Sequence, residues 1–425
     1  MSSEIRISHE VIDGIDLSLV TQEGSEALRT SVVLPFSTEP INSGSMPHET
    51  PHVMEHVVCS GDGSMDSAEY QEYMASKGGH TNAYTSATNN GLLNFETIQP
   101  DDATDRVIKM ISSVFSPALD QAVLDSEREI VRNELRGYLQ DPARQRRTTK
   151  DYWQGITYKT EETGLAGLDT ITVEVMRELH ANTFTRQNAR IVLAGSPQAA
   201  ETVALQIPDI TKAVPDGKRI VAASGLIVPL PNYNAPAPEK PSGTTEYTYT
   251  VVSNHEEIAG SDFSELRIAV NALFSFIKEG ENGIHNQSRA RGLSYGVNSW
   301  TTFGKDQVAL SVSDTTMTNH VEPQIALFHE SLRRLETYTA NDFDNYRTKQ
   351  LGSAKIRQED VLALSGTVGS LVGRDLHDYI ISADSYRALL AESESSTIVE
   401  AVKRLGQRLQ NADFVIRHSF GDNPF

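Results

Sequence analysis

The sequence predicts an α+β fold made of two homologous α/β-roll domains, each a mostly antiparallel sheet packed with helices. Strand and helix patterns are mixed in both halves of the chain, and the second half repeats the order of the first. Between the halves, residues 222–245 hold five prolines and little periodicity, which is typical of a stiff, extended linker. We therefore expect an N-terminal domain over 1–221 and a C-terminal domain over 246–425.

The first half contains the patterns of three strand regions and two helices. A buried apolar run predicts the first strand, and Asn90 followed by Gly91 is a strong signal for a hairpin turn. An amphipathic pattern predicts a helix that ends near a glycine pair, and a second pattern predicts a long helix. In chain order, the expected elements are a strand at 29–36, a helix at 65–78, a hairpin at 80–98, a helix at 120–140 and a strand at 188–196.

The second half echoes this order weakly. It is expected to hold a strand at 246–254, a helix at 264–280, a hairpin at 292–314 and a helix at 321–338. This half has no histidine pair ahead of its hairpin. A metal site, if the protein has one, is therefore expected only in the N-terminal domain.

Composition excludes several classes of protein. The 425 residues exceed one ordinary core, and 38% are hydrophobic while 22% are charged, as in a globular protein. No apolar run reaches the roughly 18 residues of a membrane span, so no membrane association is expected. A net charge of −20 argues against binding to nucleic acid.

The cysteine count and the N-terminus bear on the compartment. Cys59 is the only cysteine of the sequence, so no intramolecular disulfide can form, which fits a reducing environment. The opening stretch MSSEIRISHEVIDG lacks the basic region and apolar core of a secretory signal. We therefore expect a cytoplasmic protein.

The stretch PHVMEHVVCSG, from Pro51, carries two histidines and a carboxylate within five residues. If it is a helix with Thr50 as N-cap and Pro51 in its first turn, His52 and His56 lie one turn apart on one face. Two imidazoles so placed suit one zinc ion, and Glu55 beside them suits proton transfer from water at the metal. The motif alone leaves a second interpretation open, in which these are surface residues of an amphipathic helix.

A catalytic zinc site needs a third protein ligand, and the helix expected at 120–140 offers two candidates. Glu127 and Glu134 are seven residues apart and share one helix face, so one can ligate the metal while the other orders a ligand or water. The alternative is a solvated acidic stripe paired with Arg128, Arg132 and Arg136. The helix taken alone favours that stripe.

These residues resemble the inverted-motif zinc peptidases of the pitrilysin, insulin-degrading enzyme and mitochondrial processing peptidase family. His52, Glu55 and His56 match its H-x-x-E-H motif. The 77 residues between His56 and Glu134, and the seven-residue step from Glu127 to Glu134, match its spacings. The resemblance implies that His52, His56 and Glu134 are the zinc ligands, that Glu55 is the general base and that Glu127 is a further catalytic-site carboxylate.

Two further stretches extend the resemblance to substrate binding. GGHTNAYTS is similar to the family's edge strand, where the positions of Asn82 and Ala83 contact an extended peptide that pairs as an added strand. Asn82 can also be read simply as a hairpin residue. RARGLSYGV is similar to the segment that supplies a substrate-binding tyrosine, here Tyr295.

One position departs from that family. The arginine expected seven residues before Tyr295 falls on Ser288, and Arg289 stands one residue late. One residue turns a helical side chain by about 100°. Either a local irregularity brings Arg289 to the substrate, or a partner chain supplies the arginine.

The resemblance implies a zinc endopeptidase that cleaves short or unfolded peptides inside a chamber of four such domains. Since this chain has two, we expect a homodimer, or a heterodimer with a related chain. Two alternatives stay open: a non-catalytic scaffold subunit of the same fold, and a structural zinc site in which Cys59 is the fourth ligand. Cys59 reads more simply as a small buried apolar residue. Manganese or cobalt would also fit such ligands.

Overall fold

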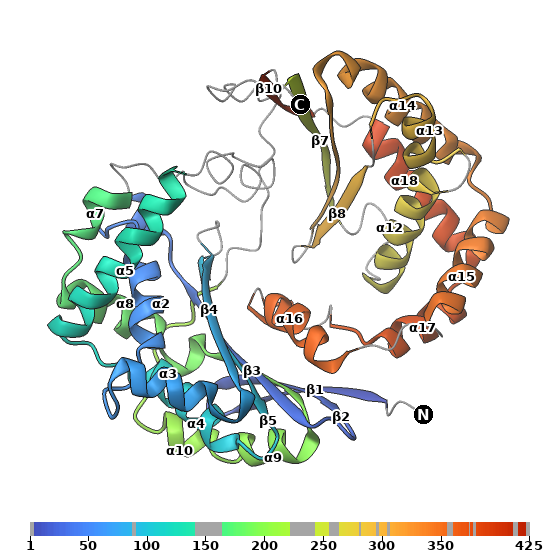
Figure 1. Cartoon of the computed structure of the whole chain (residues 1–425). Helices are drawn as coiled ribbons and strands as arrows, with labels where there is room; N and C mark the ends of the chain where they lie inside the picture. Colours follow the sequence, from blue (N-terminus) through green and yellow to red (C-terminus); the bar gives the residue numbers. More distant parts are fainter. Residues whose placement is uncertain are drawn as a thin grey trace. The chain divides into compact units, whose positions relative to one another are not determined.

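The computed structural model describes residues 4–86, 91–140, 164–221, 243–254, 263–279, 282–294, 297–303, 307–354, 360–373, 375–376, 380–410 and 415–421. The chain forms two compact units (Figure 1). The first contains the described residues up to 221 and those between 360 and 384, and the second contains the other described residues. The predicted linker at 222–245 lies outside the described residues, except that its last three begin a strand.

The first unit is built on a six-stranded sheet with the order β1-β2-β6-β3-β5-β4. Its strands are β1 (Ile5–Ile12), β2 (Ile15–Gln22), β3 (Ala27–Phe36), β4 (His80–Ser86), β5 (Gly91–Pro100) and β6 (Arg190–Gly195). Strands β2 and β6 are parallel, and the other neighbours are antiparallel. Strand β4 lies at one edge, with β5 as its described neighbour.

Helices cover one face of this sheet and enclose the main core (Figure 1). They are α2 (Thr50–Cys59), α3 (Ser67–Ala75), α4 (Thr104–Phe115), α5 (Gln121–Gln140), α8 (Val173–Thr183), α9 (Pro197–Ala204) and α10 (Ile207–Thr211). Short helical turns lie at α1 (Glu39–Asn42), η1 (Ser76–Gly78), α7 (Ala166–Leu168) and η3 (Arg186–Asn188). Helix α2 packs against both α5 and β4.

Strand β6 is buried on both faces, which explains the apolar sequence that follows Arg190 in it. Ile191 and Leu193 belong to the main core, whereas the alternate residues Val192 and Ala194 belong to a smaller cluster with helix α16 (Val361–Val372). Helix α16 comes from the second half of the sequence but packs on β6, β3 and β2 of the first unit. The linear order of the sequence gives no sign of this packing.

An ion pair ties the segment after α16 to the same sheet. Arg190 at the start of β6 has no exposed surface, and its Nη2 atom lies 2.7 Å from Oδ1 of Asp375. The same carboxylate oxygen accepts a hydrogen bond from Arg219 at 2.8 Å. A buried guanidinium requires such a partner because water cannot reach it.

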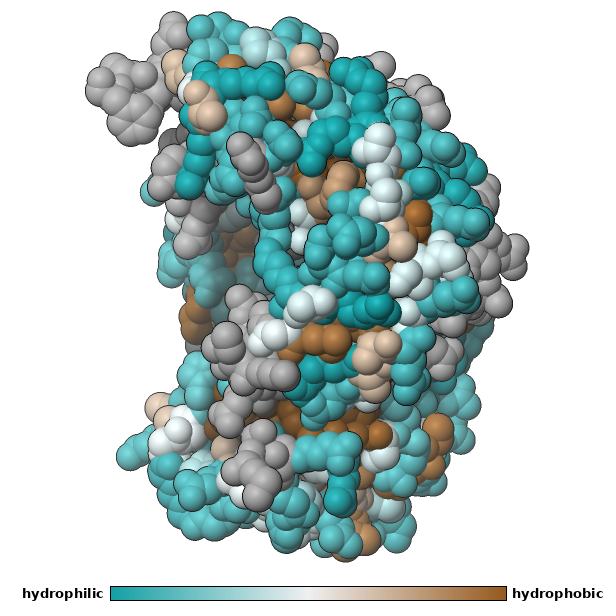
Figure 2. Space-filling model, turned by 90° about the vertical axis from the view of Figure 1, so that its right-hand side faces the viewer, coloured by the Kyte–Doolittle hydropathy of each residue, from teal (hydrophilic) through white to brown (hydrophobic). Residues whose placement is uncertain are grey.

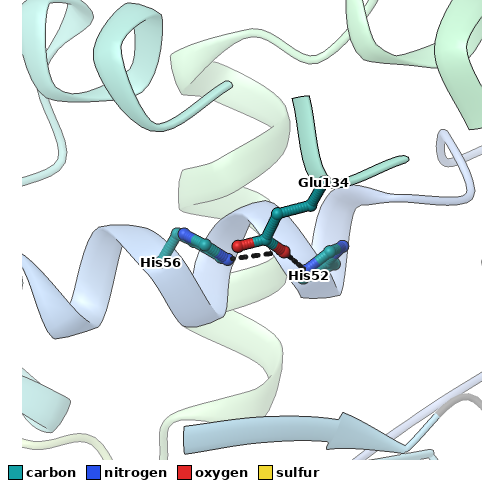
Figure 3. Close-up of side chains that lie close together, drawn as sticks. All are labelled: His52, His56 and Glu134. Carbon is teal, nitrogen blue, oxygen red and sulfur yellow. Dashed lines mark ion pairs between the residues drawn. The ribbon is translucent and has the colours of Figure 1, made fainter. Parts of the chain in front are cut away.

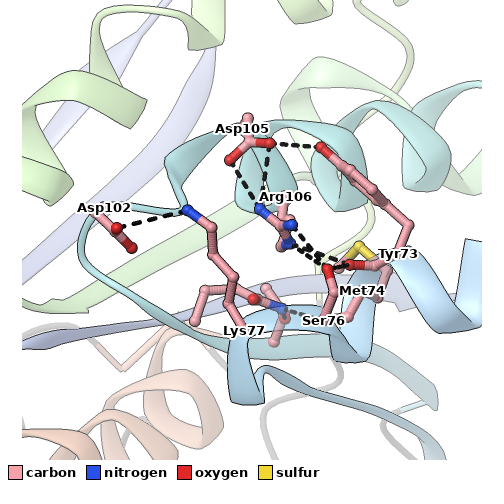
Figure 4. Close-up of polar contacts among 9 residues, drawn as sticks. Tyr73, Met74, Ser76, Lys77, Asp102, Asp105 and Arg106 are labelled. Atoms are coloured by element: carbon pink, nitrogen blue, oxygen red, sulfur yellow. Dashed lines mark hydrogen bonds and ion pairs between the residues drawn. The ribbon is translucent and has the colours of Figure 1, made fainter.

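The turn that leads into edge strand β4 is held by polar contacts from α4 and β5 (Figure 4). Arg106 on α4 donates hydrogen bonds to the carbonyl of Tyr73 and to Oγ of Ser76 at 3.0 and 2.7 Å. Gln99 on β5 donates to the carbonyl of Met74 at 3.0 Å. These bonds satisfy carbonyls at the end of α3 and fix where β4 begins.

The second unit has a four-stranded antiparallel sheet with the order β10-β7-β9-β8. Its strands are β7 (Gly243–Asn254), β8 (Asn298–Phe303), β9 (Gln307–Met317) and β10 (Val415–Gly421). Its helices are α12 (Phe263–Lys278), α13 (Ile284–Ala290), α14 (Val321–Arg333), α15 (Ala340–Ala354), most of α17 (Ala383–Glu392) and α18 (Ser395–Gln410), with helical turns η4 (Thr318–His320) and η5 (Arg334–Thr337). Helix α18 packs against α12, α14 and α15 around a separate core.

The predicted α+β class is confirmed. Both expected hairpins are present as antiparallel pairs, β4 with β5 and β8 with β9, although the turn at Asn90 lies outside the described residues. One local prediction is wrong: Thr50 is the first residue of α2, and Glu49 occupies the N-cap position. Thr50 uses its hydroxyl to bond the carbonyl of Pro47 instead.

Hydrophilic residues cover most of the face seen in Figure 2, and hydrophobic residues appear there in scattered patches. Among the described residues, the exposed large hydrophobic side chains are scattered along the sequence at Val11, Tyr84, Ile130, Leu205, Val221 and Met317. Single exposed apolar residues are normal on a protein surface. No helix in the described part of the chain is long and apolar enough to cross a membrane.

We expect Asp375→Asn to lower the free energy of unfolding by about 2–4 kcal/mol, because the Arg190 charge would stay buried without an anionic partner. Asparagine tolerates the positive φ of 57° at this position, so backbone strain should not contribute. Asp102→Asn, which removes an exposed pair with Lys77, should change it by less than about 0.5 kcal/mol. Urea unfolding followed by circular dichroism measures both, and equal effects would contradict the account of α16 docking.

Candidate metal centre and active site

Helix α2 divides its residues between the core and the site. Val53, Met54, Val57 and Val58 are buried in the main core, and Pro51 occupies the first turn, where its missing N–H costs nothing. His52, Glu55 and His56 lie on the remaining surface and are partly buried. The apolar residues therefore fix the helix, and the spacing of its polar residues sets which of them share a face.

The structure brings His52, His56 and Glu134 together, although the glutamate comes from α5 (Figure 3). Oε2 of Glu134 lies 3.4 Å from Nε2 of His52 and 3.6 Å from Nε2 of His56. The two imidazole rings are 5.1 Å apart at their centroids. Across the residues that the structure describes, this is the one group of histidine, cysteine and acidic side chains close enough to hold a metal ion.

This donor set suits zinc. Ligand atoms about 2.0–2.1 Å from a tetrahedral ion lie about 3.4 Å from one another, close to the separations measured between the carboxylate and the imidazoles. Two nitrogens and one oxygen leave a fourth position for water or substrate, as catalytic zinc sites require. The side chain of Glu134 is 52% exposed, so the cluster reaches the protein surface.

Each of the two histidines also faces a second carboxylate through its other ring nitrogen. Nδ1 of His52 lies 2.9 Å from Oε2 of Glu49, and Nδ1 of His56 lies 3.5 Å from Oε2 of Glu127. Both carboxylates are buried. Such partners orient imidazole ligands and fix their tautomers.

Two hydroxyl groups hold the acidic side chains in place. Ser60 donates a hydrogen bond of 2.6 Å to Oε1 of Glu127, and Thr85 on β4 donates one of 2.6 Å to Oε2 of Glu55. The second bond links the candidate general base to the edge strand.

Sequence reasoning missed Ser60, Thr85 and Glu49. Ser60 follows His56 by four residues, and Glu49 precedes His52 by three. These are helical spacings, and they could have indicated both residues.

Carboxylates outnumber cations at this site. Burial by itself lowers the pKa of His56, but Glu127, Glu134 and Glu55 outweigh it, so the pKa lies above its ordinary value of 6.5. The metal-free site therefore attracts a proton to His56. A divalent cation at the same place would offset more of this negative charge than a single proton does.

Cys59 does not belong to the group that could hold a metal, within the described part of the chain. Burial, together with the charges of Glu55 and Glu127, raises the pKa of its thiol to about 12. A thiol with that pKa is a poor ligand and a poor nucleophile at neutral pH. Its environment fits the apolar interpretation better than a fourth zinc ligand.

The predicted substrate residues fall in three different situations. Asn82 and Ala83 lie on β4, with Asn82 exposed and Ala83 partly buried against the main core. Tyr295 lies outside the described residues. Arg289 is exposed near the end of α13, whereas Ser288 has no exposed surface and donates a hydrogen bond of 2.9 Å to Gln324.

Residues 41–165 match the family model of insulinase, peptidase family M16. This range contains the whole candidate metal centre on α2 and α5. No curated protein matches the chain in sequence.

Solved structures resemble the chain over its full length. A protease from Helicobacter pylori is 12% identical with a TM-score of 0.73, and the match covers 98% of this chain and 99% of that one. The first half of the periplasmic protease PqqL from Escherichia coli is 13% identical with a TM-score of 0.72, covering 100% and 93%. A peptidase M16 inactive domain from Pseudomonas fluorescens is 14% identical with a TM-score of 0.69, covering 99% and 100%. The chain therefore has the two-domain fold of M16 peptidases.

We expect Cys59→Ala to keep the same zinc content as the unchanged chain, because the protonated thiol takes no part in binding. Zinc per chain can be measured by atomic emission after dialysis, with His56→Ala as the variant that should lose the metal. Loss of zinc from Cys59→Ala, with the fold intact, would instead indicate a closed structural site.

We also expect zinc affinity to rise with pH. In the metal-free chain, protonated His56 stabilises the fold below its unfolded pKa of about 6.5, and this stabilisation is lost as pH rises through the raised folded value. Zinc requires the neutral ring. Below the folded pKa of His56, each decrease of one pH unit should therefore weaken zinc binding by up to about tenfold. Competition with a chelating dye between pH 6 and 8 measures this, and a constant affinity over that range would contradict it.

Proposed function

We propose that the chain is a zinc-dependent endopeptidase that hydrolyses short or unfolded peptides. The observation that carries the proposal is the meeting of His52, His56 and Glu134 around a space suited to zinc, with Glu55 one residue from His56. The match of residues 41–165 to the M16 peptidase family supports the same reaction class. Manganese or cobalt would also fit the same ligands.

Each side chain has a distinct part in the proposed reaction. A zinc ion held by His52, His56 and Glu134 would polarise the scissile carbonyl and lower the pKa of water at the site. Glu55 accepts the proton of the attacking water and passes it to the leaving amine. The hydrogen bond from Thr85 keeps the Glu55 carboxylate oriented. Glu127 faces Nδ1 of His56 and keeps that ring oriented.

Edge strand β4 is the proposed substrate platform. It has β5 on one side, and an extended peptide can pair with its other side through main-chain hydrogen bonds at Asn82 and Ala83. Thr85, two residues further along, contacts Glu55, so a peptide paired with β4 would lie near the candidate base. Pairing of this kind selects extended chains over folded proteins. We further propose that the active form is a homodimer or a heterodimer with a related chain.

A second candidate function is a subunit that needs a partner for catalysis or acts as a scaffold. It is favoured by one observation, the burial of Ser288 where related peptidases have a substrate-binding arginine. Arg289, on the next residue, is exposed, and its role toward substrate stays a proposal, as does that of Tyr295. The similarity to a protein described as an inactive M16 domain is consistent with this alternative.

Glu55→Gln should reduce kcat/KM for a mixed library of unfolded peptides by about 10²-fold or more, because the amide cannot accept a proton. Its zinc content should equal that of the unchanged chain, since the ligands remain. Mass spectrometry of the products measures cleavage. Glu72→Gln, on the exposed surface of α3, is the matched control and should cleave normally.

The outcomes separate the two candidates. If the unchanged chain and Glu55→Gln both bind zinc but neither cleaves, the endopeptidase proposal fails for the isolated chain and the partner-dependent subunit is favoured. If both cleave equally, Glu55 is not the general base.

A further inference from the structure

Glu49 is a buried carboxylate that lies outside the H-x-x-E-H motif. It directly precedes α2, and only 1% of its side chain is exposed. Although it occupies the N-cap position, its side chain makes no capping hydrogen bond to the N–H groups of the helix. A carboxylate taken out of water needs strong polar partners. The partners of Glu49 therefore indicate its role.

Two imidazoles are among its partners. Oε2 of Glu49 lies 2.9 Å from Nδ1 of His52, and Oε1 lies 3.2 Å from Nδ1 of His48. An ionised carboxylate only accepts hydrogen bonds, so an ionised Glu49 favours the tautomers of His48 and His52 that carry the proton on Nδ1. In that tautomer of His52 the lone pair lies on Nε2, the atom that faces Glu134.

The result is a matched arrangement around the two histidines of the motif. Each ring presents Nε2 to Glu134 and Nδ1 to a buried carboxylate, which is Glu49 for His52 and Glu127 for His56. Glu127 comes from α5, whereas Glu49 belongs to the segment that begins α2. The His52–Glu49 distance is the shorter of the two, at 2.9 against 3.5 Å.

We propose that Glu49 is a positioning residue of the metal centre. It holds the His52 ring in one orientation and one tautomer, and its negative charge makes Nε2 a stronger donor to a metal. The inference rests on the proposed function, because it takes the cluster of His52, His56 and Glu134 to be a zinc site. Glu49 itself touches neither metal nor substrate in this account.

Zinc affinity tests the proposal without reference to peptidase activity. Competition with a chelating dye should show about 10–100-fold weaker binding for Glu49→Ala. Glu49→Gln should fall between this variant and the unchanged chain, because its amide oxygen still accepts from Nδ1 but carries no charge. The visible spectrum of the cobalt-substituted protein should change in Glu49→Ala, as expected if His52 is no longer held in place.

Glu96→Gln is the matched control. It removes a partly buried carboxylate from the same unit, where Glu96 pairs with Arg29 at 2.7 Å, and it should leave zinc affinity and the cobalt spectrum unchanged. Thermal unfolding of the metal-free variants shows which remain folded. If Glu49→Ala does not fold, the folded Glu49→Gln carries the test alone.

Three results would overturn the inference, and they differ in what else they affect. If Glu49→Gln and Glu49→Ala bind zinc as tightly as the unchanged chain, only the role of Glu49 fails. If Glu96→Gln weakens binding as much as Glu49→Gln, the effect reflects general destabilisation. If the unchanged chain binds no metal, the proposed function fails and takes this inference with it.

Discussion

The packing of α2 against α5 is the constraint on which the candidate site depends. Val53 and Val57 on α2, and Val131 and Leu135 on α5, are buried in one core, and this fixes how the two helices approach. Helical periodicity then places His52 and His56 on one partly buried face of α2. Glu127 and Glu134 lie almost two turns apart on α5, on the same side of the helix. One helix therefore supplies both a buried carboxylate, Glu127, and an exposed one, Glu134.

Electrostatics turns this packing into a site for a cation. Glu49 and Glu127 are buried, and burying a carboxylate is costly unless charged or polar groups compensate. Ser60 and the two imidazoles provide part of the compensation, and the pKa of His56, raised by its acidic neighbours despite burial, shows that positive charge is still attracted. A core assembled for stability alone has little reason to gather so many acidic groups, whereas a metal centre requires them.

Much of the candidate site follows from sequence spacing, because it depends on local helix geometry. Helical periodicity alone places His52, His56, Glu127 and Glu134 on two helix faces, and the hairpin pattern places Asn82 on a strand. Glu49 is harder to predict, because it lies outside the motif and Thr50 beside it is the more typical N-cap residue. Ser288 shows a different limit, since its burial depends on packing within the second unit.

Other features depend on contacts between residues far apart in the sequence. Helix α16, which begins at Val361, docks on β6, which ends at Gly195, so the contact joins distant parts of the sequence. Nothing in the apolar run of α16 indicates which sheet it covers. After Arg190 the sequence of β6 is apolar, which implies that both faces of the strand are covered. It does not indicate which element covers the second face.

The most direct test of the central claim is anomalous diffraction at the zinc absorption edge from crystals of the zinc-loaded chain. The account predicts one strong peak, about 2.0–2.2 Å from Nε2 of His52, Nε2 of His56 and a carboxylate oxygen of Glu134. A peak bound to Cys59, or zinc held elsewhere with this cluster empty, would contradict it.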